Sequence, residues 1–144
     1  MKFIVKKTDN REKGVFASKN IKKGEEVLSF RGNKIVKKRD HHTLQIGLRK
    51  HFIVLPPEKY VNHSCCPTCG IKNNKTLIAI KQIKKGEEIT FDYAMTESKL
   101  SGMKCLCGNK KCRGKIFGFL QLNEKEKNKY KKYCSDYLKQ YVKG

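Results

Sequence analysis

The sequence predicts a mostly β fold of several small sheets that ends in a helical segment. Short alternating or β-branched runs are separated by turn residues about every ten positions, which is typical of short strands. After residue 123 the apolar side chains change to helical spacing. The 144 residues are one domain's length, and with only three prolines and no low-complexity tract the chain shows no linker. We therefore expect one β-rich domain with a helical end.

Seven runs have the alternating or β-branched pattern of strands. They cover Phe3–Val5, Val15–Ala17, Val27–Phe30, Leu44–Leu48, Phe52–Leu55, Thr76–Ile80 and Glu88–Phe91. Their shortness and the turn residues between them favour several small sheets.

One turn segment occurs twice in the chain. Residues 17–27 follow the pattern Ala-x3-Ile-Lys-Lys-Gly-Glu-Glu-Val, and residues 79–89 repeat it with Ile in the last place. Gly24 and Gly86 stand at the same place in each copy, where glycine suits a turn with positive φ. Two copies are too few for a solenoid, so we interpret them as one turn used twice.

The C-terminal segment has the pattern of an amphipathic helix. Its apolar side chains lie at positions i, i+3, i+4, i+7, i+8 and i+11, namely Tyr130, Tyr133, Cys134, Tyr137, Leu138 and Tyr141. Asn123 and Glu126 have the spacing of a capping box, and Ser135–Asp136 is an alternative start for a second, shorter helix. We interpret the tyrosine stripe as core packing, because such stripes usually bury one helix face.

The net charge of +21 is large for a chain of this size. It suits a polyanionic partner such as nucleic acid, since lysines that neutralise phosphates release counterions. The alternative is a lysine-biased surface without a specific partner: only five of the 34 basic residues are arginine, the residue that base-reading sites favour. Charge alone does not decide between these interpretations.

The sequence indicates an intracellular protein. No run of 18 apolar residues occurs, which predicts no membrane contact, and the first residues lack the apolar stretch of a signal peptide. Thiols stay reduced inside cells, so the seven cysteines favour a metal site over disulfides.

Three of these cysteines have the spacing of a metal-binding loop. Cys105-x-Cys107-x4-Cys112 encloses a polar, turn-prone segment and lacks one thiolate for tetrahedral zinc. From spacing alone, Cys65, Cys66 or Cys69 completes the set. Cys134, on the apolar helix face, is predicted to be a structural thiol. Cys66 and Cys69 also form a Cys-x-x-Cys pair, but the βαβ pattern expected around a redox motif is missing.

Three motifs in order carry a family resemblance. They are Asn62-His63-Ser64-Cys65-x-Pro67, then the segment 86–93 with the sequence Gly-Glu-Glu-Ile-Thr-Phe-Asp-Tyr, then the cysteine loop followed by Arg-Gly. In this combination, over residues 3–119, the chain resembles the SET-domain protein lysine methyltransferases with a post-SET zinc loop. The resemblance implies a β-clip fold in which residues 60–66 and 89–93 form a pseudoknot. It also implies a SET domain at 1–103, a post-SET segment at 104–119 and a helical extension at 120–144.

The resemblance also implies a site. Tyr93 matches the catalytic tyrosine, Phe91 and Phe30 would line the substrate-lysine channel, and Cys65 would join Cys105, Cys107 and Cys112 on zinc. Phe52 is a further channel candidate, with core packing as the alternative. S-adenosylmethionine would be the methyl donor, leaving S-adenosylhomocysteine. The residues expected to bind it are Lys13, Gly14, Val15, Phe16, Asn62, His63, Tyr93 and Phe119, with Ile116 and Phe117 as alternatives to Phe119 over the adenine.

Expectations for the reaction follow from the same resemblance. Phe91 stands where the family chooses between Phe and Tyr, and a Phe there leaves room for a di- or trimethylated product. The expected substrate is a lysine of a histone or another basic chromosomal protein. Phe30-Arg31-Gly32 departs from the family's common Tyr-x-Gly and removes one channel hydroxyl. The competing hypothesis is a zinc-stabilised basic module that binds nucleic acid or chromatin without catalysis.

Overall fold

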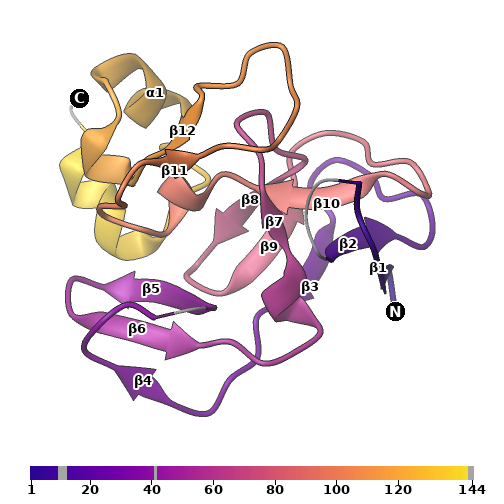
Figure 1. Ribbon diagram of the computed structural model, residues 1–144, viewed down its shortest axis with the longest axis horizontal. Coiled ribbons are helices and arrows are strands. Elements are labelled where there is room, and N and C mark those ends of the chain that lie inside the picture. The colour runs from indigo at the N-terminus through magenta and orange to yellow at the C-terminus, as the bar shows by residue number, and fades with distance from the viewer. Residues whose placement is uncertain (10–12, 41, 143–144) are drawn as a thin grey trace.

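The computed structural model describes residues 1–9, 13–40 and 42–142 and contains four small sheets (Figure 1). The first sheet has the order β1 (Phe3–Lys6), β2 (Gly14–Ala17), β10 (Glu88–Phe91) and β7 (Asn62–His63). The second has the order β3 (Glu26–Ser29), β9 (Thr76–Ala79), β8 (Cys69–Lys72), and the third the order β4 (Ile35–Val36), β6 (Lys50–Ile53), β5 (Thr43–Gly47). The fourth is a hairpin of β11 (Met103–Lys104) and β12 (Lys115–Ile116). The predicted β class with small sheets is confirmed.

All seven predicted strands are present, but five further strands were not predicted. These are β4, β7, β8, β11 and β12. Four of them are only two residues long, and β8 contains Gly70. A two-residue strand has no alternation to recognise, and glycine is unfavourable in a strand unless another segment approaches closely. At Gly70 the Tyr133 side chain does so, only 2.6 Å from where a Cβ would stand.

The two copies of the repeated turn pair with each other across the molecule. Ile21 and Ile83 form an antiparallel bridge with both backbone hydrogen bonds, at 2.7 and 2.9 Å. The amide of Gly24 donates to Ala79 and that of Gly86 donates to Ala17, at 2.7 and 2.8 Å. The two segments therefore hydrogen-bond in matching ways, joining the sheet of β2 and β10 to the sheet of β3 and β9. Both isoleucines are fully buried at this junction.

Strand β7 is the element that brings the central motif to the site. It pairs in parallel with β10, with Asn62 opposite Thr90 and His63 opposite Phe91. The segments 60–66 and 89–93 therefore lie side by side, as the sequence resemblance implied. Parallel neighbours need a crossover connection, and here β8 and β9 lie between them in the chain.

The C-terminal segment forms two short helical elements that cover the end of the molecule opposite β1 (Figure 1). Helix α1 (Glu124–Lys129) begins with the predicted capping box of Asn123 and Glu126, and a 3-10 helix, η4 (Asp136–Tyr141), follows Ser135. The alternative with a second helical start therefore holds, although Ser135 makes no side-chain cap hydrogen bond. Tyr130, Cys134 and Leu138 are buried, so the apolar stripe is core packing. Three further 3-10 helices are η1 (Glu58–Tyr60), η2 (Tyr93–Met95) and η3 (Phe119–Gln121).

Among the described residues, none of the helices has the length and apolar character needed to span a bilayer.

Candidate functional site

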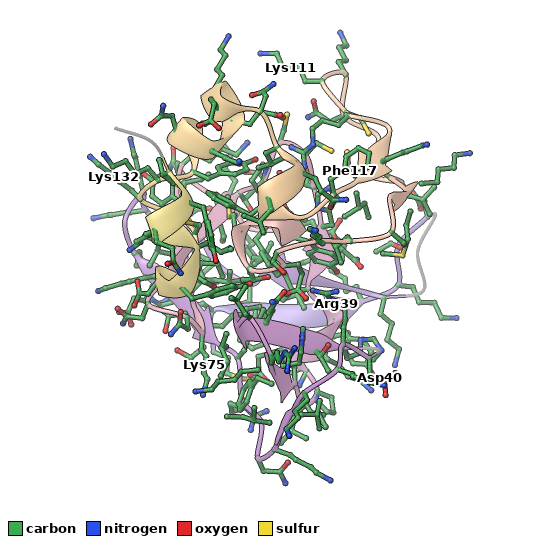
Figure 2. All side chains as sticks on the ribbon, turned by 90° about the vertical axis from the view of Figure 1, so that its left-hand side faces the viewer. Arg39, Asp40, Lys75, Lys111, Phe117 and Lys132 are labelled. Atoms are coloured by element: carbon green, nitrogen blue, oxygen red, sulfur yellow. The ribbon has the colours of Figure 1, made fainter. Side chains whose placement is uncertain are left out.

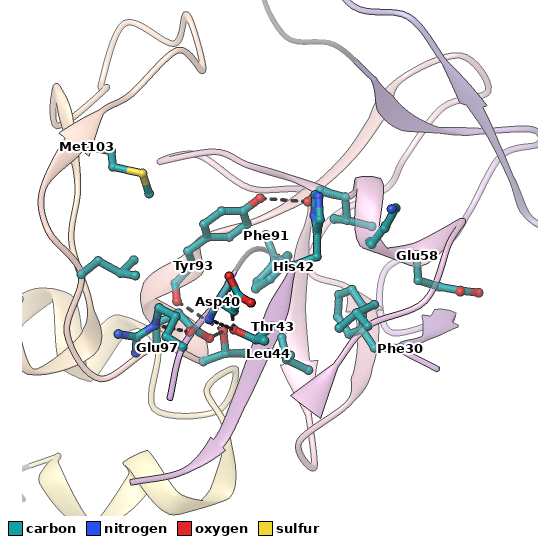
Figure 3. A pocket seen from close by; sticks show the side chains of 16 residues that line it. Phe30, Asp40, His42, Thr43, Leu44, Glu58, Phe91, Tyr93, Glu97 and Met103 are labelled. Carbon is teal, nitrogen blue, oxygen red and sulfur yellow. Dashed lines mark hydrogen bonds and ion pairs between the residues drawn. The ribbon is translucent and has the colours of Figure 1, made fainter. Parts of the chain in front are cut away.

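An aromatic pocket of about 270 Å³ opens between β5, β10 and the segment after β10 (Figure 3). Phe30, Phe91 and Tyr93 all line it, together with the apolar side chains of Leu44, Val54 and Val61. The ring centroids of Phe30 and Phe91 are 5.7 Å apart, and those of Phe91 and Tyr93 are 5.1 Å apart. These rings come from two distant parts of the sequence, around residue 30 and at 91–93, so the fold assembles an aromatic wall in a pocket that charged side chains also line.

Tyr93 is held in place by two hydrogen bonds to the neighbouring strand segment. Its hydroxyl donates to the carbonyl oxygen of Val61 at 3.0 Å, and its amide donates to Nδ1 of His63 at 3.0 Å. Tyr93 is also the first residue of η2, whose N-cap is Asp92. The residue is therefore fixed at both its hydroxyl and its backbone, and it lines the pocket while partly buried.

The hydrogen bonds of His63 determine which of its nitrogens carries the proton. Nδ1 accepts from the Tyr93 amide, so the proton of the neutral ring is assigned to Nε2. Nε2 lies 3.4 Å from the sulfur of Cys65 and donates to it. His63 is buried and its ring meets Tyr93 edge to face at 5.3 Å. The His63 imidazole therefore connects the backbone of Tyr93 to the sulfur of Cys65.

On the other side of β7, Asn62 reaches the N-terminal region. Its side-chain nitrogen donates to the carbonyl of Lys13 at 2.7 Å and to Glu88 at 3.0 Å. Gly14 lies directly beside these two side chains. A Cβ added to it would be 3.1 Å from the side-chain nitrogen of Asn62 and 2.7 Å from a carboxylate oxygen of Glu88. Lys13, Gly14 and Asn62 are thus brought together although 49 residues separate Lys13 from Asn62.

Four cysteine sulfurs form one cluster. Those of Cys65, Cys105, Cys107 and Cys112 all lie within 4.8 Å of one another, and the Cys65 and Cys105 sulfurs are 3.7 Å apart. Zinc bound to four sulfurs at about 2.3 Å places neighbouring sulfurs roughly 3.8 Å apart, so the cluster fits that ion. The amides of Arg113 and Gly114 donate to the sulfurs of Cys65 and Cys112 at 3.4 and 3.3 Å.

The thiols of this cluster differ in acidity in the absence of metal. Burial raises the pKa of Cys65 to about 11 and also raises that of Cys105. At Cys107 burial acts in the same direction, but hydrogen bonds from the backbone of Asn109 and Cys65 and from the neighbouring thiols outweigh it and lower the pKa to about 6. The hydrogen bonds among these thiols therefore favour a thiolate in the cluster, the form that binds a cation.

The cysteines outside the cluster behave as core thiols or lie at its edge. Cys69 is fully buried in β8 and burial raises its pKa to about 12, whereas a reactive thiol needs a lowered pKa. Cys134 is fully buried as well, and burial raises its pKa to about 11. Cys66 is half-buried beside the cluster. This arrangement does not favour the Cys-x-x-Cys redox alternative.

A buried carboxylate connects the cysteine loop to the segment that carries Tyr93. Asp92 has no exposed surface, and Arg113 binds both of its oxygens at 2.7 and 2.9 Å. The Tyr130 hydroxyl donates to the same carboxylate at 2.7 Å, and the Ala94 amide does so at 3.0 Å. Burial would lower the pKa of Arg113, but the Asp92 carboxylate raises it above the ordinary value. Arg113 directly follows Cys112, so the metal loop and the residue before Tyr93 are one connected unit.

A second network, which the sequence did not predict, joins two residues of the pocket lining, the exposed Arg39 and the buried Glu97, to the buried Gln45. Glu97 accepts hydrogen bonds from Arg39 at 2.9 Å and from the Gln45 amide at 2.9 Å. The Arg39 guanidinium also donates to the Gln45 side chain at 2.6 Å. These contacts tie the loop before β5 to the segment after Tyr93. No sequence signal could have found them, because 58 residues separate Arg39 from Glu97.

The remaining predicted residues lie at some distance from the pocket. Val15 is fully buried, so only its backbone is available to a ligand, and Phe16 is half-buried beneath Lys6. Phe119 is fully buried in the core, whereas Phe117 is half-buried. Phe52 packs against Gly32 and does not line the pocket, which agrees with the core-packing alternative.

The fold and this arrangement of residues are similar to those of SET-domain proteins. The family model described as "SET domain" matches residues 43–94, which contain the pocket strand β5, the Asn62–His63 strand and Tyr93. This segment of the chain is therefore similar to the SET domain.

Curated relatives of the chain are histone-lysine methyltransferases. The H3 lysine-9 specific enzyme dim-5 of Neurospora crassa is 40% identical over 83 residues, which cover 42% of this chain and 25% of that protein. The H3 lysine-4 specific enzyme of Schizosaccharomyces pombe is 27% identical over 125 residues, covering 70% of this chain and 14% of the relative. The chain thus spans a quarter or less of the length of these relatives.

Solved structures give the same fold. One from a study of the product specificity of histone lysine methyltransferases has a TM-score of 0.61 and 29% identity, covering 78% of this chain and 55% of that one. KRYPTONITE, solved with mCHH DNA, an H3(1–15) peptide and SAH, has a TM-score of 0.66 at 18% identity, covering 81% of this chain and 30% of that one. The second likeness supports the fold alone.

Proposed function

We propose that the protein transfers methyl groups from S-adenosylmethionine to the side-chain amine of a lysine in a protein substrate. The observation that carries this proposal is the pocket lined by Phe30, Phe91 and Tyr93, with the Tyr93 hydroxyl bound to the residue before the Asn62–His63 strand. A lysine side chain is long and apolar up to its amine, so a pocket with an aromatic wall suits it. The names of the relatives support a histone as the substrate.

The pocket suits the protonation state that the reaction needs. A free lysine has a pKa of about 10.4, yet only the neutral amine can act as the nucleophile. Burial of the amine beside Phe30, Phe91 and Tyr93 disfavours the ammonium form and so lowers that pKa. Carboxylates in the same wall act in the opposite direction, but Glu58 and Glu97 are already paired with Arg31 and Arg39. S-adenosylmethionine supplies a methyl group on a sulfonium centre when bound. The chain's own contribution is alignment of the amine in line with that methyl, which is worth several orders of magnitude in rate.

The cofactor-binding residues are proposed on the opposite side of β7 from the pocket. Lys13, Gly14 and Asn62 meet there, and the backbones of Val15 and Phe16 continue along β2. Gly14 is buried, and the side chains of Thr8, Asn62 and Glu88 fill the space beside it, so the groups offered to a cofactor there are those around the glycine. Phe117 is a better placed aromatic cover than the fully buried Phe119, because its ring is partly accessible. His63 would serve by holding Tyr93 rather than by exposing its ring.

Zinc is proposed on Cys65, Cys105, Cys107 and Cys112, where its role is structural. With four sulfur ligands no coordination position remains for substrate. The division into a SET domain at 1–103, a zinc-binding segment at 104–119 and a helical extension from 120 fits the element order. We place the protein where chromosomal proteins are found, in a nucleus or nucleoid.

Methyl transfer is tested with purified protein, labelled S-adenosylmethionine and recombinant histones. We expect label on histone lysines, and we expect S-adenosylhomocysteine to suppress it. A Tyr93→Phe variant is the matched control, because phenylalanine fills the same space without the hydroxyl. If wild type and variant transfer equally little label while the protein binds chromatin, the non-catalytic binding module is the correct function.

A further inference from the structure

A shallow basic groove lies between the tip of the β5–β6 hairpin and η4. Lys37, Arg49 and Lys50 supply three cations to its walls, Leu48 and Tyr137 supply apolar surface, and no acidic side chain lines it. The hairpin tip and η4 belong to different parts of the chain, yet they face each other at one edge of the molecule (Figure 1). This groove has no part in the proposed methyl-transfer site.

The positive charge of the groove is not neutralised by its neighbours. Among residues 1–9, 13–40 and 42–142, no ion pair engages Lys37, Arg49 or Lys50, and all three are exposed. Asp136, at the start of η4, is paired with Lys139 at 3.1 Å. Figure 2 shows other lysines, such as Lys111 and Lys132, projecting from the surface elsewhere. What distinguishes the groove is that its cations converge on a concave surface.

We propose that this groove binds the phosphate backbone of a nucleic acid. Three cations without an acid nearby match a row of phosphates, and each phosphate neutralised releases a counterion. The net charge of +21 extends the attraction beyond the groove, which favours a long polyanion over a short acidic peptide. Two of the three cations are lysines, which contact phosphates as point charges, so binding should be independent of base sequence.

The groove lies near the aromatic pocket, so bound nucleic acid would help to deliver the substrate. This step rests on the proposed function. Strand β5 has Leu44 in the wall of the aromatic pocket and Leu48, just past its end, in the groove. Four residues along a strand span about 13 Å. A substrate tail that leaves the pocket would therefore reach bound nucleic acid within a few residues. A chain of charge +21 would repel a free basic tail, but a tail carried on nucleic acid arrives with its charge neutralised.

The test is direct binding of a fluorescent 20-base-pair DNA duplex, followed by anisotropy at several salt concentrations. The groove variant is Lys37→Gln, Arg49→Gln, Lys50→Gln. The matched control is Lys23→Gln, Lys84→Gln, Lys85→Gln, which removes the same charge from exposed lysines of the repeated turns. We expect the groove variant to bind at least about tenfold more weakly and its salt slope to fall by about 2 to 3. The control should lose less than about threefold, and two duplexes of unrelated sequence should bind alike.

Three results would overturn the proposal: no binding by the wild type, equal losses in the groove variant and the control, or poly-glutamate competing as well as DNA of equal charge. Equal losses would mean diffuse attraction to the whole surface, and effective competition would point to an acidic protein partner. Because the assay needs no turnover, its outcome is independent of whether methyl transfer is found.

Discussion

At the scale of single residues, Tyr93 is the one tyrosine of the described residues that both lines the aromatic pocket and is held by its hydroxyl and its amide. Its amide and hydroxyl are both bound to the segment 61–63, and its ring lines the pocket beside Phe91. Tyr130 and Tyr137 also use their hydroxyls, but burial raises the pKa of both above the ordinary value, and their partners are structural. The hydroxyl that meets the pocket is therefore the one to remove first.

We expect Tyr93→Phe to lower the methyl-transfer rate by about a hundredfold, the order reported for the loss of one well-placed polar group in an active site. The ring still fills its place, so cofactor affinity should change less than about threefold. Single-turnover rates and calorimetric binding of S-adenosylhomocysteine separate the two effects. A variant with more than a tenth of the wild-type rate would exclude Tyr93 from the chemistry.

Phe91 is expected to set the number of methyl groups added. Its ring lies between Phe30 and Tyr93, and an added hydroxyl there would hold a water molecule that crowds the amine. Wild type should therefore give di- or trimethyl-lysine, and Phe91→Tyr should shift the product towards monomethyl. Mass spectrometry of a methylated peptide over time checks this. Only monomethyl product from wild type would contradict the prediction.

At the scale of elements, the cysteine loop and helix α1 are attached to the β core through one carboxylate. Asp92 binds Arg113, which belongs to the cysteine loop, and Tyr130, the residue that directly follows α1. Neither contact is encoded by a local pattern, since 21 and 38 residues separate the partners. A buried charge without partners is strongly destabilising, so these contacts hold three segments together.

Tyr130→Phe removes one hydrogen bond to this carboxylate and leaves the ring. Bonds to charged groups are worth about 2 kcal/mol, so the free energy of unfolding in urea should fall by about that amount. Tyr133→Phe is the matched control, because no hydrogen bond of the Tyr133 hydroxyl is present in the described structure. Equal, small effects of the two substitutions would show that Arg113 alone satisfies Asp92.

The repeated turns give a second test at this scale. Gly24 and Gly86 have φ of +88° and +93°, and a Cβ on either would meet nothing within 4 Å. Alanine there should destabilise the fold through backbone conformation alone, by about 1 kcal/mol or somewhat more at each position. Gly47→Ala is the control, since its φ is ordinary and its Cβ contacts lie at 3.4 Å or more. Chemical denaturation of the three variants decides whether the two turns contribute equally.

At the scale of the whole molecule, the sequence predicted what local patterns and short motifs encode. Seven of the eight strands of four or five residues, the capping box at Asn123 and the turn glycines all follow from spacing. The pairing of Ile21 with Ile83, the Arg39–Glu97 contact and the Asp92 network depend on segments that meet only after folding. The position of Phe119 in the core shows the same limit, because an aromatic residue after the cysteine loop suits either packing or a ligand.

Removal of zinc should affect the active site before it affects the β core. Two connections run from the cluster to Tyr93: Cys65 through His63, and Arg113 through Asp92. Without metal the loop loses the bonds that hold its sulfurs together, and metal binding of this kind is coupled to local folding. We expect chelation to weaken cofactor binding by about tenfold, within the usual range of coupling between sites. The circular dichroism should change little, because only the short β11–β12 hairpin encloses the loop, whereas the three larger sheets share the core cluster that includes Val15, Ile21, Leu77 and Ile89.

The measurement is calorimetric cofactor binding before chelation, after it, and after zinc is restored. Recovery on adding zinc separates metal loss from irreversible damage to the thiols. A chelated protein that binds the cofactor and transfers methyl groups at the full rate would show that the loop is a separate structural unit. In that case His63 would be fixed by β7 and Tyr93 alone, and the hydrogen bond from its Nε2 to Cys65 would have no consequence for catalysis.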